Sequence, residues 1–214
     1  MVSIKGTDGR YRYDGPVSPR RSVADAQRTR ETIVDRAVEI GSTDGLASLS
    51  FGRVAEDLAL SKSGVIRHFP TKEDLQLAAI EEARHVFRAT VWDPVADRPA
   101  GLVRLRAIMR SWLAYHERCP FPGGCFLAAA SAEVDGQPGP VRDAVRADDA
   151  QWAAVLERDI DIAIRAGELP AETDRAQLAF ELYAIALMTN HGFQLRGDAR
   201  SGTRGRRAVQ RLLG

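Results

Sequence analysis

The sequence has little cysteine, no long apolar run and almost no net charge, and each of these absences excludes a class of protein. Its 214 residues include only two cysteines, Cys119 and Cys125, which are too few for a disulfide scaffold. No apolar stretch approaches the roughly 20 residues that a membrane-spanning helix needs, and the first residues lack the apolar core of a signal peptide. We therefore expect a soluble, cytoplasmic protein with no membrane partner.

Metal and cofactor sites are not indicated either. Cys119 and Cys125 lie too far apart for a close-spaced zinc-binding pair, and the four histidines are scattered along the chain. The formal net charge is only +1, so any affinity for a polyanion must come from a local basic patch. We expect neither a metal nor a cofactor.

Helical periodicity runs through most of the chain, and no stretch shows the alternation of a β-strand. The expected helices cover approximately residues 26–43, 51–58, 61–69, 72–90, 100–117, 125–134, 141–166, 174–195 and 201–213. Residues 1–25 are rich in glycine, proline and polar side chains and predict a flexible tail. The expected fold is therefore all-α, with about nine helices in total.

Two short helices joined by a tight corner are predicted between Ser50 and Lys72. Ser50 can cap the first helix, because its hydroxyl can accept a hydrogen bond from an otherwise unpaired backbone N–H. Ser61 can cap the second helix, which ends before Pro70. This arrangement predicts a helix-turn-helix motif over approximately residues 49–68.

The outer face of the second short helix is cationic. No carboxylate occurs between Leu58 and Lys72, whereas Lys62, Arg67 and His68 all lie there. A short capped helix with a cationic face, braced by a second helix, fits the major groove of DNA. The pattern alone fits an ordinary helical hairpin with a solvated polar face equally well, since helix-turn-helix geometry also occurs without DNA binding.

The segment from Arg30 to Leu75 resembles the N-terminal domain of the TetR family of bacterial transcription regulators. The family signature S-K-x-x-[apolar]-x-x-H-F-x-[ST]-K-[ED]-x-L is represented here by Ser61-Lys62, Val65, His68-Phe69, Thr71-Lys72-Glu73 and Leu75. The resemblance implies a three-helix DNA-binding domain over residues 26–75. It also implies a helical-bundle domain over residues 76–214 that binds an effector and dimerises.

The resemblance also implies which side chains meet DNA. Cationic and capping residues would hold phosphates or base edges, and small or apolar residues of the second short helix would face bases. The expected contact residues are Ser50, Arg53, Lys62, Ser63, Gly64, Ile66, Arg67, His68 and Lys72.

The chain departs from the family pattern beside this signature. The family usually carries an aromatic residue one or two positions before His68, where this chain has Ile66 and Arg67. A tyrosine contact to phosphate is therefore missing, and Arg67 can replace it with a charge contact or read a guanine. Phe51 stands where the family often has Ser or Thr, which removes a second candidate phosphate contact.

The second part of the chain is rich in large side chains that can line a cavity. Core packing explains most of them individually, but the resemblance implies an effector pocket among the helices, and such pockets are apolar with few polar anchors. The expected ligand-binding residues are Phe87, Met109, Trp112, Tyr115, His116, Cys125, Phe126, Trp152, Tyr183 and Met188.

The helix expected over residues 174–195 is apolar on more than one stripe, so more than one of its sides must be covered. The resemblance implies a homodimer joined through the last two helices, which sets two DNA-binding helices about one DNA turn, roughly 34 Å, apart on a palindromic site. The expected interface residues are Leu178, Leu182, Ile185, Val209 and Leu212. A monomeric bundle with this helix at its centre is the alternative.

These expectations combine into one hypothesis, a non-enzymatic, ligand-responsive DNA-binding regulator. Its partners are double-stranded DNA, a small-molecule effector and a second copy of the chain, and it acts as a repressor that leaves a palindromic operator when the effector binds. One alternative is a small all-α enzyme that uses Cys125 as a nucleophile with His116 or His191 as its base. Another is a TetR-like protein that has lost DNA binding.

Overall fold

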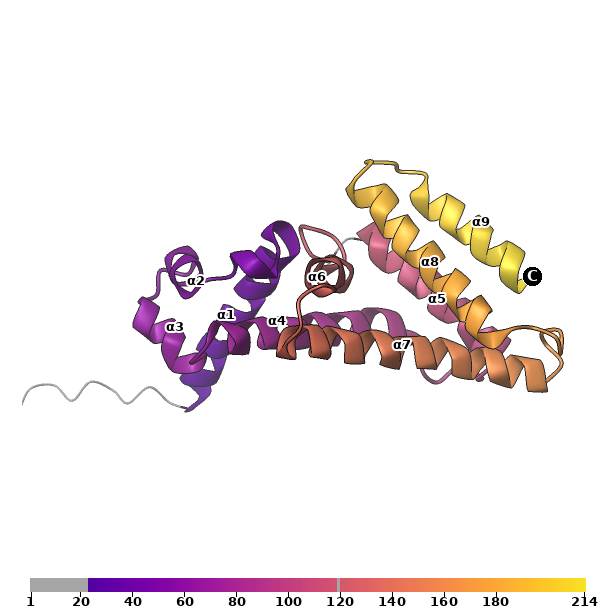
Figure 1. The fold of residues 1–214 in the computed structure, drawn as a ribbon, viewed down its shortest axis with the longest axis horizontal. Coiled ribbons are helices and arrows are strands. Elements are labelled where there is room, and N and C mark those ends of the chain that lie inside the picture. The colour runs from indigo at the N-terminus through magenta and orange to yellow at the C-terminus, as the bar shows by residue number, and fades with distance from the viewer. Residues whose placement is uncertain (1–22, 119) are drawn as a thin grey trace, which may run out of the picture.

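The computed structural model describes residues 23–118 and 120–214, and these residues form nine α-helices and no strand (Figure 1). The expected all-α fold is therefore confirmed. The expected tail lies outside the described residues up to position 22, and Cys119 lies outside them too. The helices are α1 (Val23–Asp44), α2 (Phe51–Asp57), α3 (Lys62–His68), α4 (Lys72–Phe87), α5 (Leu102–Arg118), α6 (Phe126–Val134), α7 (Pro140–Arg165), α8 (Arg175–Gln194) and α9 (Ser201–Leu213).

Short helical turns extend two of these elements. A 3₁₀ turn, η1 (Leu46–Ser48), lies between α1 and α2. A π-helical turn, η2 (Arg88–Trp92), and a 3₁₀ turn, η3 (Asp93–Val95), continue α4. The helix expected to continue to about residue 90 therefore changes its hydrogen-bonding pattern after Phe87, and Pro94 lies within the 3₁₀ turn that follows.

The helix boundaries around the corner follow from side-chain caps. The Ser50 hydroxyl accepts a hydrogen bond from the Arg53 backbone N–H at 3.2 Å, and the Ser61 hydroxyl accepts one from Gly64 at 3.0 Å. The corner itself places Ala59 in the left-handed region with φ 52°, and the Leu60 N–H closes the end of α2 on the Ala55 carbonyl. These local bonds fix the angle at which α3 leaves α2.

The molecule is elongated, and α4 and α7 run along its length (Figure 1). Helices α1, α2 and α3 form one end, and α5, α8 and α9 form the other, with α6 between them. Arg84 of α4 donates to Asp148 of α7 at 2.7 Å and ties the two long helices together. A movement at one end of the molecule can therefore be transmitted toward the other end along α4 and α7.

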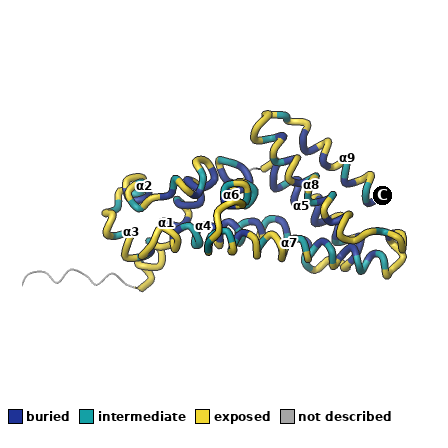
Figure 2. Tube along the Cα trace, viewed as in Figure 1, coloured by how far each residue is buried: buried dark blue, intermediate teal, exposed yellow. Residues whose placement is uncertain are grey.

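The buried residues form two apolar cores, which appear as dark blue segments in Figure 2. The N-terminal core is not made by α1 to α4 alone, because α6 contributes Phe126, Ala130 and Val134 and α7 contributes Val145. Gly41 makes this packing possible, since a Cβ there would lie 2.7 Å from the Phe126 ring. Helix α6 is thus built into the helix-turn-helix end of the molecule.

One ion pair is buried in the other core. Arg104 of α5 donates to both carboxylate oxygens of Asp159 on α7, at 2.8 and 2.6 Å. The Asp159 side chain is 0% exposed and that of Arg104 is 11% exposed. The hydrogen bond to Asp159 also raises the pKa of Arg104 above its usual value, so the guanidinium remains charged, and its bonds to Asp159 hold α5 against α7.

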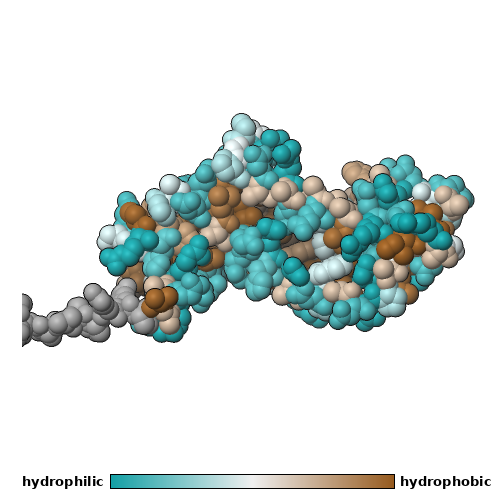
Figure 3. Space-filling model, turned by 90° about the horizontal axis from the view of Figure 1, so that it is seen from below, coloured by the Kyte–Doolittle hydropathy of each residue, from teal (hydrophilic) through white to brown (hydrophobic). Residues whose placement is uncertain are grey.

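The face of the molecule in Figure 3 is mostly hydrophilic, and its apolar residues lie in separate patches. Among the described helices, none combines the length and the apolar character that a bilayer crossing requires.

Candidate functional site

Helix α3 presents a row of polar side chains to solvent at the end of the molecule. Lys62, Ser63 and Arg67 are exposed, and Ile66 between them is 39% exposed. Val65 is buried in the N-terminal core. Within the described residues, neither Lys62 nor Arg67 forms an ion pair with a carboxylate. The outward face of α3 is therefore cationic and unoccupied by partners from the same chain.

Other expected contact residues are engaged within the protein. Arg53 pairs with Asp44, and Lys72 donates to the Ala47 carbonyl at 2.5 Å. Ser50 uses its hydroxyl to cap α2. These three side chains position α2 and η1, whereas His68 and Gly64 are half-buried at the edge of the α3 face.

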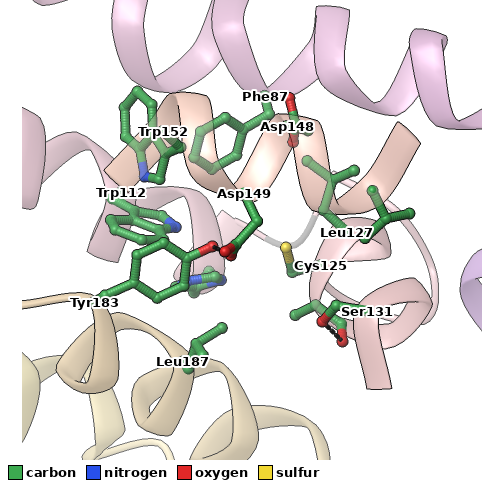
Figure 4. Close-up of a pocket in the computed structure, with 13 residues that line it drawn as sticks. Phe87, Trp112, Cys125, Leu127, Ser131, Asp148, Asp149, Trp152, Tyr183 and Leu187 are labelled. Atoms are coloured by element: carbon green, nitrogen blue, oxygen red, sulfur yellow. Dashed lines mark hydrogen bonds between the residues drawn. The ribbon is translucent and has the colours of Figure 1, made fainter. Parts of the chain in front are cut away.

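A second candidate site is a cavity of about 70 Å³ between α4, α5, α6, α7 and α8. In Figure 4 four aromatic rings stand together on one side of it, and Cys125, Leu127 and Ser131 lie on the other. The described residues around it are Phe87, Trp112, His116, Cys125, Leu127, Ala128, Ser131, Val145, Asp148, Asp149, Trp152, Tyr183 and Leu187.

The structure brings together six of the ten expected ligand-binding residues, namely Phe87, Trp112, His116, Cys125, Trp152 and Tyr183. The rings of Trp112 and Tyr183 meet edge-to-face at 5.1 Å, and those of Phe87 and Trp152 at 4.9 Å. The edge-to-face geometry of these pairs is a favourable one for aromatic rings. The cavity wall on this side is thus a set of mutually braced rings.

The other four expected ligand-binding residues lie elsewhere. Met109 is fully buried in the core around α5, and Phe126 packs into the N-terminal core. Tyr115 is 1% exposed and stands behind the wall, where its ring meets that of Phe87 edge-to-face at 5.3 Å. Met188 is 49% exposed and lines a groove between α8 and α9.

Sequence reasoning missed the two carboxylates of the cavity. Asp148 and Asp149 sit on α7, and the Tyr183 hydroxyl donates a hydrogen bond to Asp149. The signal was present, because Asp148 precedes Trp152 by four residues and therefore shares its helix face. Val145, one turn further back, lines the same cavity.

Burial controls the protonation of the groups around this cavity. It lowers the pKa of His116 to about 4, so the imidazole is neutral at pH 7. It also raises the pKa of the Cys125 thiol and that of the Tyr183 hydroxyl. A protonated thiol beside a base this weak is not an activated nucleophile, so the arrangement favours ligand binding rather than covalent chemistry.

Helix α6 connects this cavity to the helix-turn-helix end. Leu127, Ala128 and Ser131 line the cavity on one side of α6. On the opposite side, the two carboxylate oxygens of Glu133 accept hydrogen bonds from the backbone N–H groups of Leu46 and Ala47, at 2.7 and 2.6 Å.

The turn η1 is therefore held from two directions. Helix α4 binds its carbonyl oxygens, because Gln76 donates to Leu46 at 2.8 Å and Lys72 donates to Ala47. Helix α6 binds its backbone N–H groups through Glu133. Gly45, whose φ is +85°, leaves room for that carboxylate, since a Cβ there would lie 2.8 Å from it.

The helices α8 and α9 carry the residues expected at a dimer interface. Leu178, Leu182 and Val209 are buried within the protomer's own core, whereas Ile185 and Leu212 are half-buried. The large apolar side chains that α8 leaves exposed are Phe180, Leu187 and Met188. Met188 and Ile185 border a groove of about 180 Å³ between α8 and α9.

Two family models match the chain. Residues 33–79 match the model described as "Bacterial regulatory proteins, tetR family". Residues 101–209, which are about half of the chain, match the model described as "Tetracyclin repressor-like, C-terminal domain". The first match covers the helix-turn-helix end, and the second covers α5, α6, α7, α8 and most of α9.

Solved structures share the whole fold. A TetR transcriptional regulator from Chloroflexus aurantiacus is 26% identical, with a TM-score of 0.78 over 89% of this chain and 95% of that one. AibR, in complex with isovaleryl coenzyme A and operator DNA, is 21% identical, with a TM-score of 0.72 over 86% of this chain and 97% of that one.

A curated relative matches over a shorter length. The nucleoid occlusion factor SlmA of Vibrio campbellii is 27% identical over 93 residues, which are 44% of this chain. The match spans about half of that relative, 47% of its length.

Proposed function

Because this chain belongs to the TetR family of bacterial regulatory proteins, we propose that it is a repressor that leaves a palindromic operator when a small molecule binds its central cavity. The observation that carries this proposal is the face of α3. Its Lys62 and Arg67 are exposed and free of carboxylate partners among the described residues, although the rest of the surface pairs many of its arginines.

The DNA contacts divide into two groups on this proposal. Lys62, Ser63, Ile66 and Arg67 meet the major groove directly, with Arg67 suited to a phosphate or to a guanine edge and Ile66 to a thymine methyl. Arg53 and Lys72 act mainly by holding α2 and η1 in place, because each is already bonded within the protein.

Replacing Arg67 with alanine is expected to weaken operator binding about tenfold, which corresponds to about 1.4 kcal/mol. If Arg67 binds a phosphate, the variant should also depend less on salt, and the slope of log affinity against log salt should become shallower by about 0.9. Fluorescence anisotropy with the DNA upstream of the protein's own gene, at two salt concentrations, measures both quantities.

The matched control is Arg158→Ala, which removes an exposed arginine from α7 without touching α3. Its affinity and salt slope should equal those of the unchanged protein. Equal binding by the Arg67 and Arg158 variants would remove Arg67 from the interface. Absence of salt-dependent binding by the unchanged protein would refute the proposed function itself and favour a family member without DNA binding.

The route from the cavity to DNA runs through α6. A ligand that displaces Leu127, Ala128 or Ser131 moves the helix whose other side holds η1 through Glu133. Since η1 precedes α2, a shift of α6 is expected to change the orientation of α2 and α3. The ligand acts only by the difference in its affinity for the two arrangements.

The second copy needed for a palindromic site is proposed to pack on α8 and α9. The exposed Leu187 and Met188 and the groove beside Met188 supply an apolar surface there. The interface residues that we expected at Leu178, Leu182 and Val209 then act indirectly, by packing α8 and α9 onto α5 within the protomer.

Met188→Glu is expected to raise the dimer dissociation constant at least tenfold, because it places a charge in an apolar contact. Sedimentation velocity over a concentration series measures the change. Val103→Glu is the matched control, since Val103 is similarly exposed, at 45%, but lies on α5. If Met188→Glu and Val103→Glu both raise the dimer dissociation constant, or if neither does, the interface does not lie at Met188.

A further inference from the structure

The central cavity has acidic residues on its wall, and its one basic residue type among the described lining residues is His116, which burial keeps neutral at pH 7. Among the described residues that line it, two are aspartates and none is lysine or arginine. Asp148 is neutralised by Arg84, whose Nε lies 2.7 Å away. Asp149 accepts a hydrogen bond from the neutral Tyr183 hydroxyl, and no cation among the described residues pairs with it. Asp149 is an exposed residue, so its carboxylate lies where the cavity meets solvent.

The same wall holds buried polar atoms that lack partners. Trp112 Nε1, Trp152 Nε1 and both ring nitrogens of His116 find no hydrogen-bond partner among the described residues. His116 is 2% exposed and Trp112 is 3% exposed. Buried polar groups are nearly always paired, so these atoms are available to bond a hydrogen-bond acceptor that enters the cavity.

The aromatic rings define the shape and the charge of that molecule. Trp112 stands edge-to-face to both Trp152 and Tyr183, with centroids 5.5 and 5.1 Å apart. In each such pair the edge of one ring covers one face of the other, so a cation can approach only a face that remains uncovered, within about 6 Å. A ligand with a flat aromatic ring and a positive group nearby can pack on such a face and pair with the Asp149 carboxylate at the same time.

The cavity must open to admit such a molecule. Its volume of about 70 Å³ is room for roughly two waters. Asp149, Tyr183 and Leu187 also border a neighbouring hollow of about 310 Å³, and the Tyr183–Asp149 hydrogen bond belongs to the linings of both spaces. A cationic group that replaced the Tyr183 hydroxyl as the partner of Asp149 would connect the cavity with this hollow.

We propose that this cavity binds a small aromatic amine or cationic heterocycle carrying a hydrogen-bond acceptor, with Asp149 as its counter-ion, and that it rejects carboxylates and phosphates. This deepens the proposed function, since it names the chemical class of the effector at the same site. The ring lies among Trp112, Trp152 and Tyr183, and the indole N–H groups and His116 donate to the acceptor.

Three phenols that differ only in the charge of their side chain test this proposal. Tyramine is the cation, tyrosol is the neutral alcohol, and para-hydroxyphenylacetate is the anion. Calorimetric titration of the full chain without DNA should give tyramine an affinity at least about tenfold above that of tyrosol, with no binding of the carboxylate. Quenching of tryptophan fluorescence should follow the same order, because Trp112 and Trp152 line the site.

Asp149→Asn keeps an acceptor for Tyr183 but removes the charge, so it should abolish the preference for tyramine. Asp161→Asn is the matched control, because Asp161 lies on α7 outside the residues that line the cavity. Equal binding of the three phenols, binding of none at millimolar concentration, or a preference that survives Asp149→Asn would each overturn the proposal. These titrations contain no DNA, so a failure of this proposal can be distinguished from a failure of the proposed operator binding.

Discussion

Replacing Arg104 with alanine is expected to lower the free energy of unfolding by about 3–5 kcal/mol, because it leaves the buried Asp159 carboxylate without its cation and with only the Gly101 N–H as a hydrogen-bond donor among the described residues. Few single changes cost as much in a protein whose total stability is typically about 5–15 kcal/mol. Denaturation by urea, followed by far-ultraviolet circular dichroism, measures the difference. The loss is expected in the core of α5, α7 and α8, far from α3.

The chain offers a control of the same chemistry. Arg165 pairs with Asp161 on the surface of α7, with 70% of the arginine side chain exposed, and such pairs contribute about 1 kcal/mol or less. Arg165→Ala should therefore change stability little. A double variant that replaces Arg104 with methionine and Asp159 with leucine should recover most of the loss, since a well-packed apolar pair avoids the cost of burying charge. Similar losses for the two single variants would contradict this account.

The helices could be predicted because their signals are local. Caps such as Ser50 and Ser61 and breaks such as Pro70 act over a single turn, and the structure has each helix close to its expected place. The TetR resemblance is carried by the same short-range residues. Their spacing depends only on α3 and the first turn of α4, which is why the family resemblance could be found before the structure.

The parts that could not be predicted depend on contacts between distant elements. Nothing near Glu133 in the sequence indicates that its carboxylate meets η1, which lies 86 and 87 residues earlier. The burial of Leu178 and Val209 inside the protomer likewise depends on how α8 and α9 pack against α5. The apolar character of such residues indicates that they are buried, but it does not indicate whether the same chain or a second copy buries them.

The contact between α6 and η1 leads to a second prediction with a large effect. Glu133→Ala removes the acceptor of the Leu46 and Ala47 N–H groups. Hydrogen bonds to a charged acceptor each contribute about 1.5–3 kcal/mol, but this site is partly exposed. We therefore expect a local loss of about 2 kcal/mol, which corresponds to roughly 30-fold faster hydrogen exchange at these two residues.

The consequence for regulation follows from reciprocity. If α6 carries the coupling, operator DNA bound to α3 must slow hydrogen exchange in α6, around Leu127 and Ala128, in the unchanged protein, because coupling between two sites acts equally in both directions. Glu133→Ala should remove most of this protection while leaving α3 and its DNA contacts intact.

Glu168→Ala is the appropriate comparison, since Glu168 also accepts a hydrogen bond from a backbone N–H, that of Leu102, but lies just after α7, away from the helix-turn-helix end. It should destabilise the start of α5 without altering the response of α6 to DNA. If the Glu133 variant keeps the full response, the coupling must travel by a route other than the Glu133 contact, such as the long helices α4 and α7, which Arg84 and Asp148 tie together.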